Sequence, residues 1–257
     1  MNTYLINLAR TDEEKRLLAR LDDLVQKAVQ GIGGRSDFMD LRQQALAQAA
    51  ATNAAGIIWH LEGGYEQAER RRLLVSPEWG SEVAARISYL RITTHEFQAS
   101  PPGHRDYLGA VLNLGIRREK LGDIVLQNLD AVLIVADDLA DFISMHLTQV
   151  KNSRVEAEKI RPEDFVFQPP ELQAIKLNLA SLRLDAAVAA VFKLSRGQAN
   201  DLVESGVVRL NQLQIYKGSA ALQPGDLISV RGQGRFRLEE IGTMSRKGRQ
   251  WVLISRW

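Results

Sequence analysis

The sequence of 257 residues predicts an α+β protein with N-terminal helices, a central domain and a small C-terminal module. Residues 11–52 place apolar side chains at the spacing of helices. Residues 86–160 show strand and helix patterns in the order β-α-β-β-α-β. Prolines between residues 162 and 170 then mark a linker before the C-terminal module, because proline lacks the backbone N–H that helices and sheets need.

The N-terminal segment, residues 1–52, is predicted to be helical. Thr11 followed by Glu14 is a capping-box pattern, and leucines then recur at helical spacing. Glycines in the stretch 31–34 end this helix. Asp37 is a suitable N-cap for a second helix, which is rich in alanine.

The central domain is predicted to cover residues 53–168. Two short strands are expected first, at 56–61 and 72–75. The β-α-β-β-α-β order that follows is called ferredoxin-like, and many RNA-recognition folds share it, although the fold also supports unrelated activities. Its expected strands lie at 86–93, 123–127, 131–135 and 154–160, its helices at 104–114 and 137–147, and a hairpin turn at 128–130.

The C-terminal module is predicted to cover residues 171–257. Apolar residues fall on one face of a first helix over 184–192. Ser195 can cap a second helix, and Gln198 three residues later completes a capping box. Two strands are expected to follow, at 207–211 and 227–231.

Charge divides the chain at the same place. Residues 1–170 carry 20 Lys and Arg against 24 Asp and Glu, a net charge of −4, whereas residues 171–257 carry 13 against 7, a net charge of +6. A basic module joined to an acidic body is typical of proteins that bind a polyanion, although a role in solubility explains the charge equally well.

Several classes of protein are disfavoured by composition. The chain has no cysteine, which excludes disulfides, thiolate metal sites and cysteine nucleophiles. Its start lacks the features of a signal peptide, and no apolar run approaches the roughly 18 residues of a membrane helix. We therefore expect a cytoplasmic protein with no membrane segment, no metal and no cofactor.

The motifs of the C-terminal module resemble the RNA-binding domain named after ribosomal small-subunit protein four, the S-four domain of the αL type. The matching stretches occur in the family's order and are Arg183-Leu184-Asp185, Ser195-Arg196 with Ala199, Gly206 to Asn211, and Pro224-Gly225-Asp226. Gln212 departs from the pattern, since the family usually has glycine after the asparagine. This departure concerns the geometry of the hairpin and not the fold.

The rest of the chain resembles the YlmH-like proteins, in which an RRM-like central domain precedes an S-four domain. The matching stretches are Gly63-Gly64-Tyr65, Ala68 to Arg72, His104 to Gly109 and Gly115 to Ile124. Within that family the chain is most similar to the photosystem II S-four domain proteins of oxygenic phototrophs. The resemblance implies action on large ribosomal subunits that carry peptidyl-tRNA, in ribosome-associated quality control.

The resemblance implies that cationic and polar side chains of the module contact structured rRNA or tRNA. A helix N-terminus beside an arginine is a suitable phosphate site, which supports this interpretation. The predicted RNA-binding residues are Arg183, Lys193, Ser195, Arg196, Gln198, Asn200, Asn211, Lys217, Arg231 and Arg235. A solvated helix face with a structural cap is the alternative for the residues of the two helices.

Two further basic stretches lie in the first 170 residues. Arg117, Arg118 and Lys120 follow a predicted helix, where they form either a second RNA patch or cations that offset the helix dipole. The run Arg70 to Arg72 is interpreted as a solvated charged surface.

We predict a protein that is not an enzyme. Arg183-Leu184-Asp185 also matches a catalytic tripeptide of pseudouridine synthases, but the residues after it continue a helix here. We therefore interpret Asp185 as a residue that orients Arg183 or caps the helix. An RNA-modifying enzyme of the pseudouridine synthase or methyltransferase type remains an alternative, as does a photosystem-assembly factor anchored by RNA. A monomer is expected, although the sequence leaves the oligomeric state open.

Overall fold

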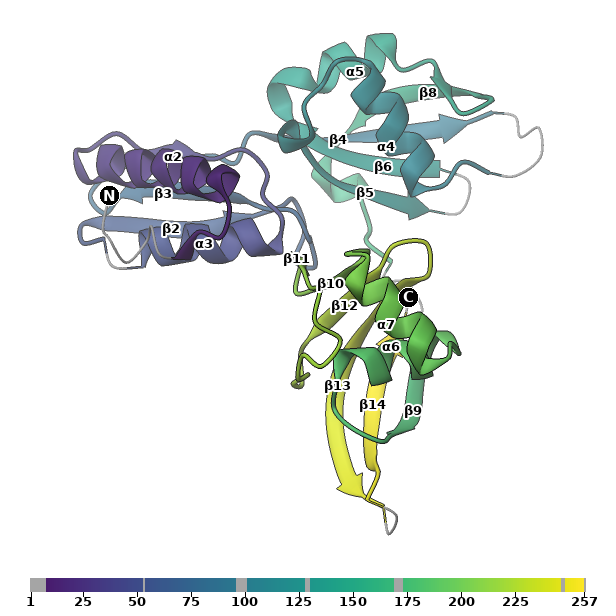
Figure 1. The fold of residues 1–257 in the computed structure, drawn as a ribbon. Coiled ribbons are helices and arrows are strands. Elements are labelled where there is room, and N and C mark those ends of the chain that lie inside the picture. The colour runs from purple at the N-terminus through teal and green to yellow at the C-terminus, as the bar shows by residue number, and fades with distance from the viewer. Residues whose placement is uncertain are drawn as a thin grey trace. The chain divides into compact units, whose positions relative to one another are not determined.

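The computed structural model describes residues 8–52, 54–95, 101–127, 130–168, 173–245 and 248–256 (Figure 1). The chain divides into two compact units, Met1–Gln168 and Pro169–Trp257. Both combine helices with antiparallel sheets, so the fold is α+β as predicted. The turn at residues 128 and 129 and the two prolines at 169 and 170 lie outside the described residues.

The first unit begins with two helices packed on a small sheet, drawn in purple and blue in Figure 1. The helices are α2 (Asp12–Val29) and α3 (Leu41–Ala51), and the strands are β1 (Gly34–Arg35), β2 (Ile57–Glu62) and β3 (Arg72–Pro77), in the sheet order β1-β3-β2. Leu21, Met39 and Leu73 share one buried core, so the strands at 57–77 belong with the N-terminal helices. The boundary that we predicted at residue 53 therefore cuts through a packed α+β substructure.

The caps of these helices agree only in part with the prediction. Thr11 Oγ1 accepts a hydrogen bond from Glu14 N at 3.2 Å and begins α2 as expected. The N-cap of α3 is Asp40 and not Asp37. The reason is that Met39 forms a β-bridge with Arg71, which keeps the chain extended up to Asp40.

The central part of the first unit has the predicted β-α-β-β-α-β order. Its elements are β4 (Ile87–Thr94), α4 (His104–Asn113), β5 (Leu121–Gln127), β6 (Asp130–Ala136), α5 (Ala140–His146) and β8 (Ser153–Ile160). A two-residue edge strand, β7 (Gln149–Val150), was not predicted and completes the sheet order β5-β6-β4-β8-β7. Figure 1 shows α4 and α5 on the same side of this sheet, where Tyr107 and Ile143 pack against Leu90 and Leu133.

The second unit is a six-stranded sheet with two helices on one face. Its elements are β9 (Gln173–Leu179), α6 (Leu184–Phe192), α7 (Arg196–Glu204), β10 (Val208–Leu210), β11 (Leu213–Gln214), β12 (Leu227–Val230), β13 (Gly234–Met244) and β14 (Gln250–Arg256). The strands lie in the order β11-β10-β12-β13-β14-β9. Val188 and Val203 from the helices pack against Ile228 and Phe236 from the sheet, so this unit has a core of its own.

No helix in the described ranges combines the length and the apolar character needed to span a bilayer.

Candidate nucleic-acid interface

A buried carboxylate lies at the centre of the predicted interface. Asp185 is the second residue of α6, and only 5% of its side chain is exposed. Its Oδ1 accepts a hydrogen bond from Arg183 Nε at 3.0 Å, and its Oδ2 accepts one from Arg183 Nη2 at 2.7 Å. Arg196, the first residue of α7, places its Nε 3.6 Å from the same Oδ2. One carboxylate therefore holds guanidinium groups from the starts of two helices.

The electrostatics of this cluster leave an excess of positive charge at the surface. The side chains of Arg183 and Arg196 are 40% and 56% exposed. Burial alone would raise the pKa of Asp185, but hydrogen bonds from Arg183 and from Ala186 N outweigh it, and the pKa lies below its usual value. Asp185 is consequently ionised at neutral pH. Its bidentate ion pair with Arg183 fixes the plane of the Arg183 guanidinium.

A glycine lets the loop after β11 approach the same carboxylate. Asp185 N donates to Gly218 O at 3.0 Å. A Cβ at Gly218 would collide with Asn200 Oδ1 and would lie 3.2 Å from Asp185 Cβ. The exposed Lys217 immediately precedes this glycine. The loop therefore brings the backbone of Lys217 beside both helices.

The start of α7 has the predicted capping box. Ser195 Oγ accepts from Gln198 N at 3.2 Å, and Gln198 Oε1 accepts from Ser195 N at 2.9 Å. These two side chains are thus used by the cap. At Gly197 an added Cβ would meet nothing closer than Ser195 Oγ at 4.0 Å, so the first turn of α7 is uncovered. Uncovered backbone amides at a helix start are suited to an anion.

Four of the predicted residues lie close to Asp185, namely Arg183, Arg196, Asn200 and the loop residue Lys217. Together with Lys193 we call them the helix patch. Lys193 is the exposed C-cap of α6 and connects the two helices. Asn200 donates from Nδ2 to Glu204 Oε1 at 2.6 Å, which directs its amide along α7.

Three predicted residues lie apart from the helix patch. Asn211 donates from Nδ2 to Asp226 Oδ1 at 2.7 Å and accepts from Leu227 N at 2.9 Å, so its amide group holds the strands together. Arg231 follows β12, where its backbone N donates to Val207 O beyond the far end of α7. Arg235 alternates with the buried Phe236 on β13 and so faces away from the two helices.

Two of the three cations proposed for a second RNA patch are engaged within the first unit. Arg118 donates to Leu121 O at 3.0 Å and to Gly122 O at 3.2 Å, and burial lowers its pKa to about 10. Lys120 Nζ lies 2.7 Å from Asp37 Oδ1. Only Arg117 of this group is exposed. The three residues therefore do not form a continuous cationic surface.

The run Arg70 to Arg72 is not a solvated surface, contrary to our interpretation. Arg72 is 6% exposed and donates to the backbone oxygens of Ser36, Ala85 and Arg86. Arg70 donates to the oxygens of Leu121 and Phe38. These guanidinium groups satisfy backbone carbonyls and so hold segments of the first unit together.

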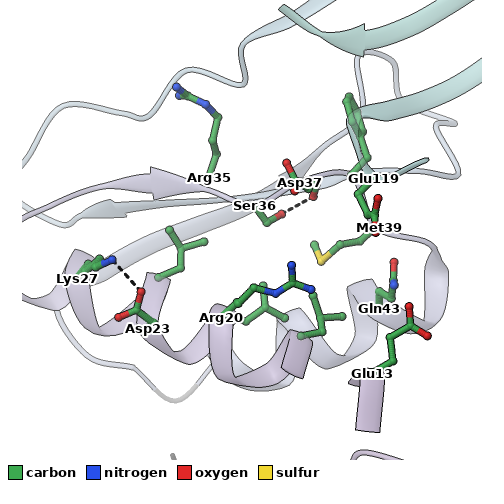
Figure 2. Close-up of a pocket in the computed structure, with 14 residues that line it drawn as sticks. Glu13, Arg20, Asp23, Lys27, Arg35, Ser36, Asp37, Met39, Gln43 and Glu119 are labelled. Carbon is green, nitrogen blue, oxygen red and sulfur yellow. Dashed lines mark hydrogen bonds and ion pairs between the residues drawn. The ribbon is translucent and has the colours of Figure 1, made fainter. Parts of the chain in front are cut away.

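The first unit also contains a cavity of about 280 Å³ between α2 and the segment 35–39 (Figure 2). Cations and carboxylates alternate around it. Lys27 pairs with Asp23 at 2.8 Å, Arg35 donates to Ala84 O at 2.9 Å, and Arg20 extends from α2 toward the cavity. This mixed charge does not favour a polyanion, so we do not include the cavity in the RNA interface.

Comparison with known proteins agrees with this architecture. Residues 94–164 match the family described as "Putative RNA-binding domain in YlmH". Over 223 residues the chain is 33% identical to "Ribosome-associated protein quality control protein P2" of Bacillus subtilis (strain 168), and the match covers 86% of each protein. The structure is similar to that of "Cell division protein ylmH from Streptococcus pneumoniae", with a TM-score of 0.51 and 18% identity over 62% of this chain and 98% of that one. At that identity the likeness shows the fold alone.

Proposed function

Because this chain belongs to the YlmH family, we propose that it is a ribosome-associated protein that binds structured RNA through the helix patch. Its relationship to the Bacillus subtilis protein supports the association with ribosomes, and the match over residues 94–164 supports RNA binding. The finer proposal is that the RNA is rRNA or tRNA on the large subunit. The name of the relative supports quality control as the process, and we propose the cytoplasm as the place because ribosomes act there.

The observation that carries the proposal is the shared carboxylate of Asp185. Two arginines are held on one side of the module before any ligand arrives, so less side-chain entropy is lost on binding. Beside them, the first turn of α7 offers uncovered amides at Gly197. Guanidinium groups and helix-terminal amides both bind phosphate oxygens, and such contacts position a protein on RNA without reading its sequence.

The same geometry supports a structural role for Asp185. Both of its carboxylate oxygens accept hydrogen bonds from Arg183, and Oδ1 also accepts from Ala186 N at 2.7 Å. A carboxylate in this state is poorly suited to attack a base, because its lone pairs are occupied and its charge is compensated. The observed contacts therefore support RNA binding over RNA modification.

Co-sedimentation with ribosomal particles tests the proposal. We expect log K to fall linearly with log salt, with a slope of about −0.9 or slightly less for each phosphate contacted, because counterions are released from the RNA. Nuclease treatment of the particles should abolish binding. Binding that is insensitive to salt and survives nuclease would show that a ribosomal protein is the partner, and the proposal would be wrong.

A further inference from the structure

The sheet face on which RRM folds stack RNA bases is already covered in this protein. Tyr89 and Ile134 alternate with core residues of β4 and β6, so they face away from α4 and α5. They form a second buried cluster together with Phe38. The ring of Phe165 lies 5.6 Å from that of Tyr89 and 5.5 Å from that of Tyr65. Tyr89 and Ile134 are therefore buried and are not available to stack on bases.

The cover is held by polar contacts as well as by packing. Asp123 Oδ2 accepts from Tyr65 Oη at 2.8 Å and from Glu69 N at 2.7 Å. Phe38 N donates to Glu119 O at 2.8 Å. The Tyr89 hydroxyl donates to the backbone oxygen of Gly64. Uncovering the sheet would break this network, so the cover is part of the folded unit.

The opposite side of the same domain has a groove of about 540 Å³. One wall is α4 and the other is the connection from α5 through β7. The polar and charged side chains that line it are Arg105, Asp106, Asn113, His146, Thr148, Gln149 and Lys151. Asp106 is the single carboxylate among the described lining residues, and it accepts a hydrogen bond from Gly103 N at 2.9 Å. At Gly109 an added Cβ would meet nothing within 4 Å, so α4 is open toward the groove.

We propose that the central domain contacts RNA through this groove and not through its sheet, an inference that rests on the proposed function. Arg105 and Lys151 supply positive charge from the two walls. Arg105 and Asn113 are eight residues apart on α4, which places them about 12 Å apart along the helix. The groove therefore offers donors over a length suited to more than one nucleotide.

His146 gives the groove a group suited to RNA rather than to any polyanion. Its Nδ1 lies 2.8 Å from Phe142 O, and its ring stacks on that of Phe142 with centroids 4.3 Å apart. A carbonyl only accepts, so Nδ1 donates to it and the other ring nitrogen, Nε2, is left to pair with a ligand. A 2′-hydroxyl can both donate and accept such a hydrogen bond, and it is the group that distinguishes RNA from DNA.

Removal of the two groove cations from the full-length chain tests this proposal, with deproteinised ribosomal RNA as the probe. Arg105→Gln with Lys151→Gln should bind about tenfold more weakly and should reduce the salt slope by about two. The matched control is Arg16→Gln with Arg20→Gln, which removes the same charge from the exposed face of α2 and should bind within about twofold of wild type.

The outcomes separate this proposal from the proposed function. If the groove variant binds like wild type while loss of Lys193 and Arg196 weakens binding, the groove proposal is wrong and the helix patch stands. If the wild-type chain does not bind the RNA, the proposed function itself fails.

Crosslinking tests independently which face of the central domain contacts RNA. A benzophenone side chain at position 113 lies in the groove, whereas one at position 158 lies on the sheet face, because Glu158 pairs with Arg91 two residues beyond Tyr89. On ribosomal particles we expect RNA crosslinks from position 113 and none from position 158. RNA crosslinks from position 158 alone, or crosslinks from position 113 to protein alone, would overturn the proposal.

Discussion

Asp185 determines how the cations of the helix patch are presented. Arg183 and Arg196 carry like charges, and without a shared counterion they would repel each other and turn apart into solvent. The carboxylate compensates one of the two charges, fixes the orientation of Arg183 by two hydrogen bonds and attracts Arg196 at 3.6 Å. If the positioning of the arginines matters most, neutralising this carboxylate should weaken RNA binding. If net charge matters most, the same change should strengthen it.

Replacement of Asp185 by asparagine separates these two effects. Asp185→Asn makes the module more positive, yet we expect weaker RNA binding because the arginines lose their shared partner. The free energy of unfolding should also fall, on the order of 1–3 kcal/mol, because hydrogen bonds to a charged group are lost. Filter binding and thermal unfolding measure the two effects. Asp201→Asn, at an exposed carboxylate of α7, is the control and should bind RNA as well as wild type or slightly better. An Asp185→Asn protein that binds RNA more tightly than wild type would contradict the positioning role.

The depressed pKa of Asp185 predicts a specific pH dependence. Its folded pKa lies below the unfolded value of about 3.9, so its stabilising contribution is present above about pH 4 and is lost as the pH falls through the folded pKa. The gap in unfolding free energy between wild type and Asp185→Asn should accordingly shrink below about pH 4. Chemical denaturation at a series of pH values measures this gap. A gap that stays constant or widens in acid would show that Asp185 is not a stabilising ion-pair partner.

At the residue scale, local contacts could be predicted and distant ones could not. The interpretation that Asp185 orients Arg183 is confirmed by two hydrogen bonds, and it could be made because the residues are two positions apart in one motif. The contacts of Arg118 and Lys120 within the first unit were not predicted. Lys120, for example, pairs with Asp37, which is 83 residues away in the sequence. Arg72 was misjudged for the same reason, because its acceptor at Ser36 belongs to another element.

At the element scale, the β10–β11 hairpin has a residue that strains its turn. Asn211 and Gln212 are the two residues between the paired Leu210 and Leu213, and they have φ values of 50° and 67°. A two-residue turn of this kind favours Asn-Gly, because a side chain at positive φ costs about 1 kcal/mol. Gln212 is the position where the sequence departs from the S-four pattern, and the backbone shows why glycine suits it.

Gln212→Gly should therefore stabilise the second unit. Relief of the strain outweighs the extra entropy of glycine in the unfolded chain, so we expect a gain of about 0.5–1 kcal/mol in the free energy of unfolding. Urea denaturation of wild type, Gln212→Gly and Gln212→Ala measures the effect, and the alanine variant should show no such gain. A glycine variant less stable than wild type would mean that the Gln212 side chain makes a stabilising contact.

The strands that were missed are the two-residue β1, β7 and β11 and the longer β9, β13 and β14. β1, β7 and β11 have two residues each, too few for a periodic pattern. β9 is different, since all seven of its residues pair with β14. Its alternating Ile175, Leu177 and Leu179 carry the period of two that predicts a strand, and this signal could have located it.

At the scale of the whole molecule, the second unit has a continuous core of its own. We therefore expect the fragment 169–257 to fold without the rest of the chain, since its helices and sheet bury their apolar faces against each other. Circular dichroism and a cooperative thermal transition test this. The fragment should also bind ribosomal RNA more weakly than the full chain, because it lacks the central domain. An unfolded fragment would show that the two units share a core.

Substitutions in the helix patch differ in their expected effect on the stability of the second unit. Removal of Arg183 would leave the buried carboxylate of Asp185 without its two-pronged partner and would destabilise the unit. The burial of Asp185 therefore argues against the joint removal of Arg183 and Arg196 as a test of binding. Lys193 and Arg196 are exposed and can be replaced with less risk to the fold.

The affinity of Lys193→Ala with Arg196→Ala for ribosomal particles is the most direct test of the helix patch. Binding should weaken by about 10- to 100-fold, since each charged contact contributes about 1 kcal/mol or more, and the melting temperature should change little. Lys176→Ala with Arg209→Ala is the matched control, because these residues alternate with core positions on β9 and β10 and lie on the sheet face away from the helices. The account predicts that the helix-patch variant loses affinity and the control does not. Equal affinities of the two folded variants, or a larger loss in the control, would contradict it.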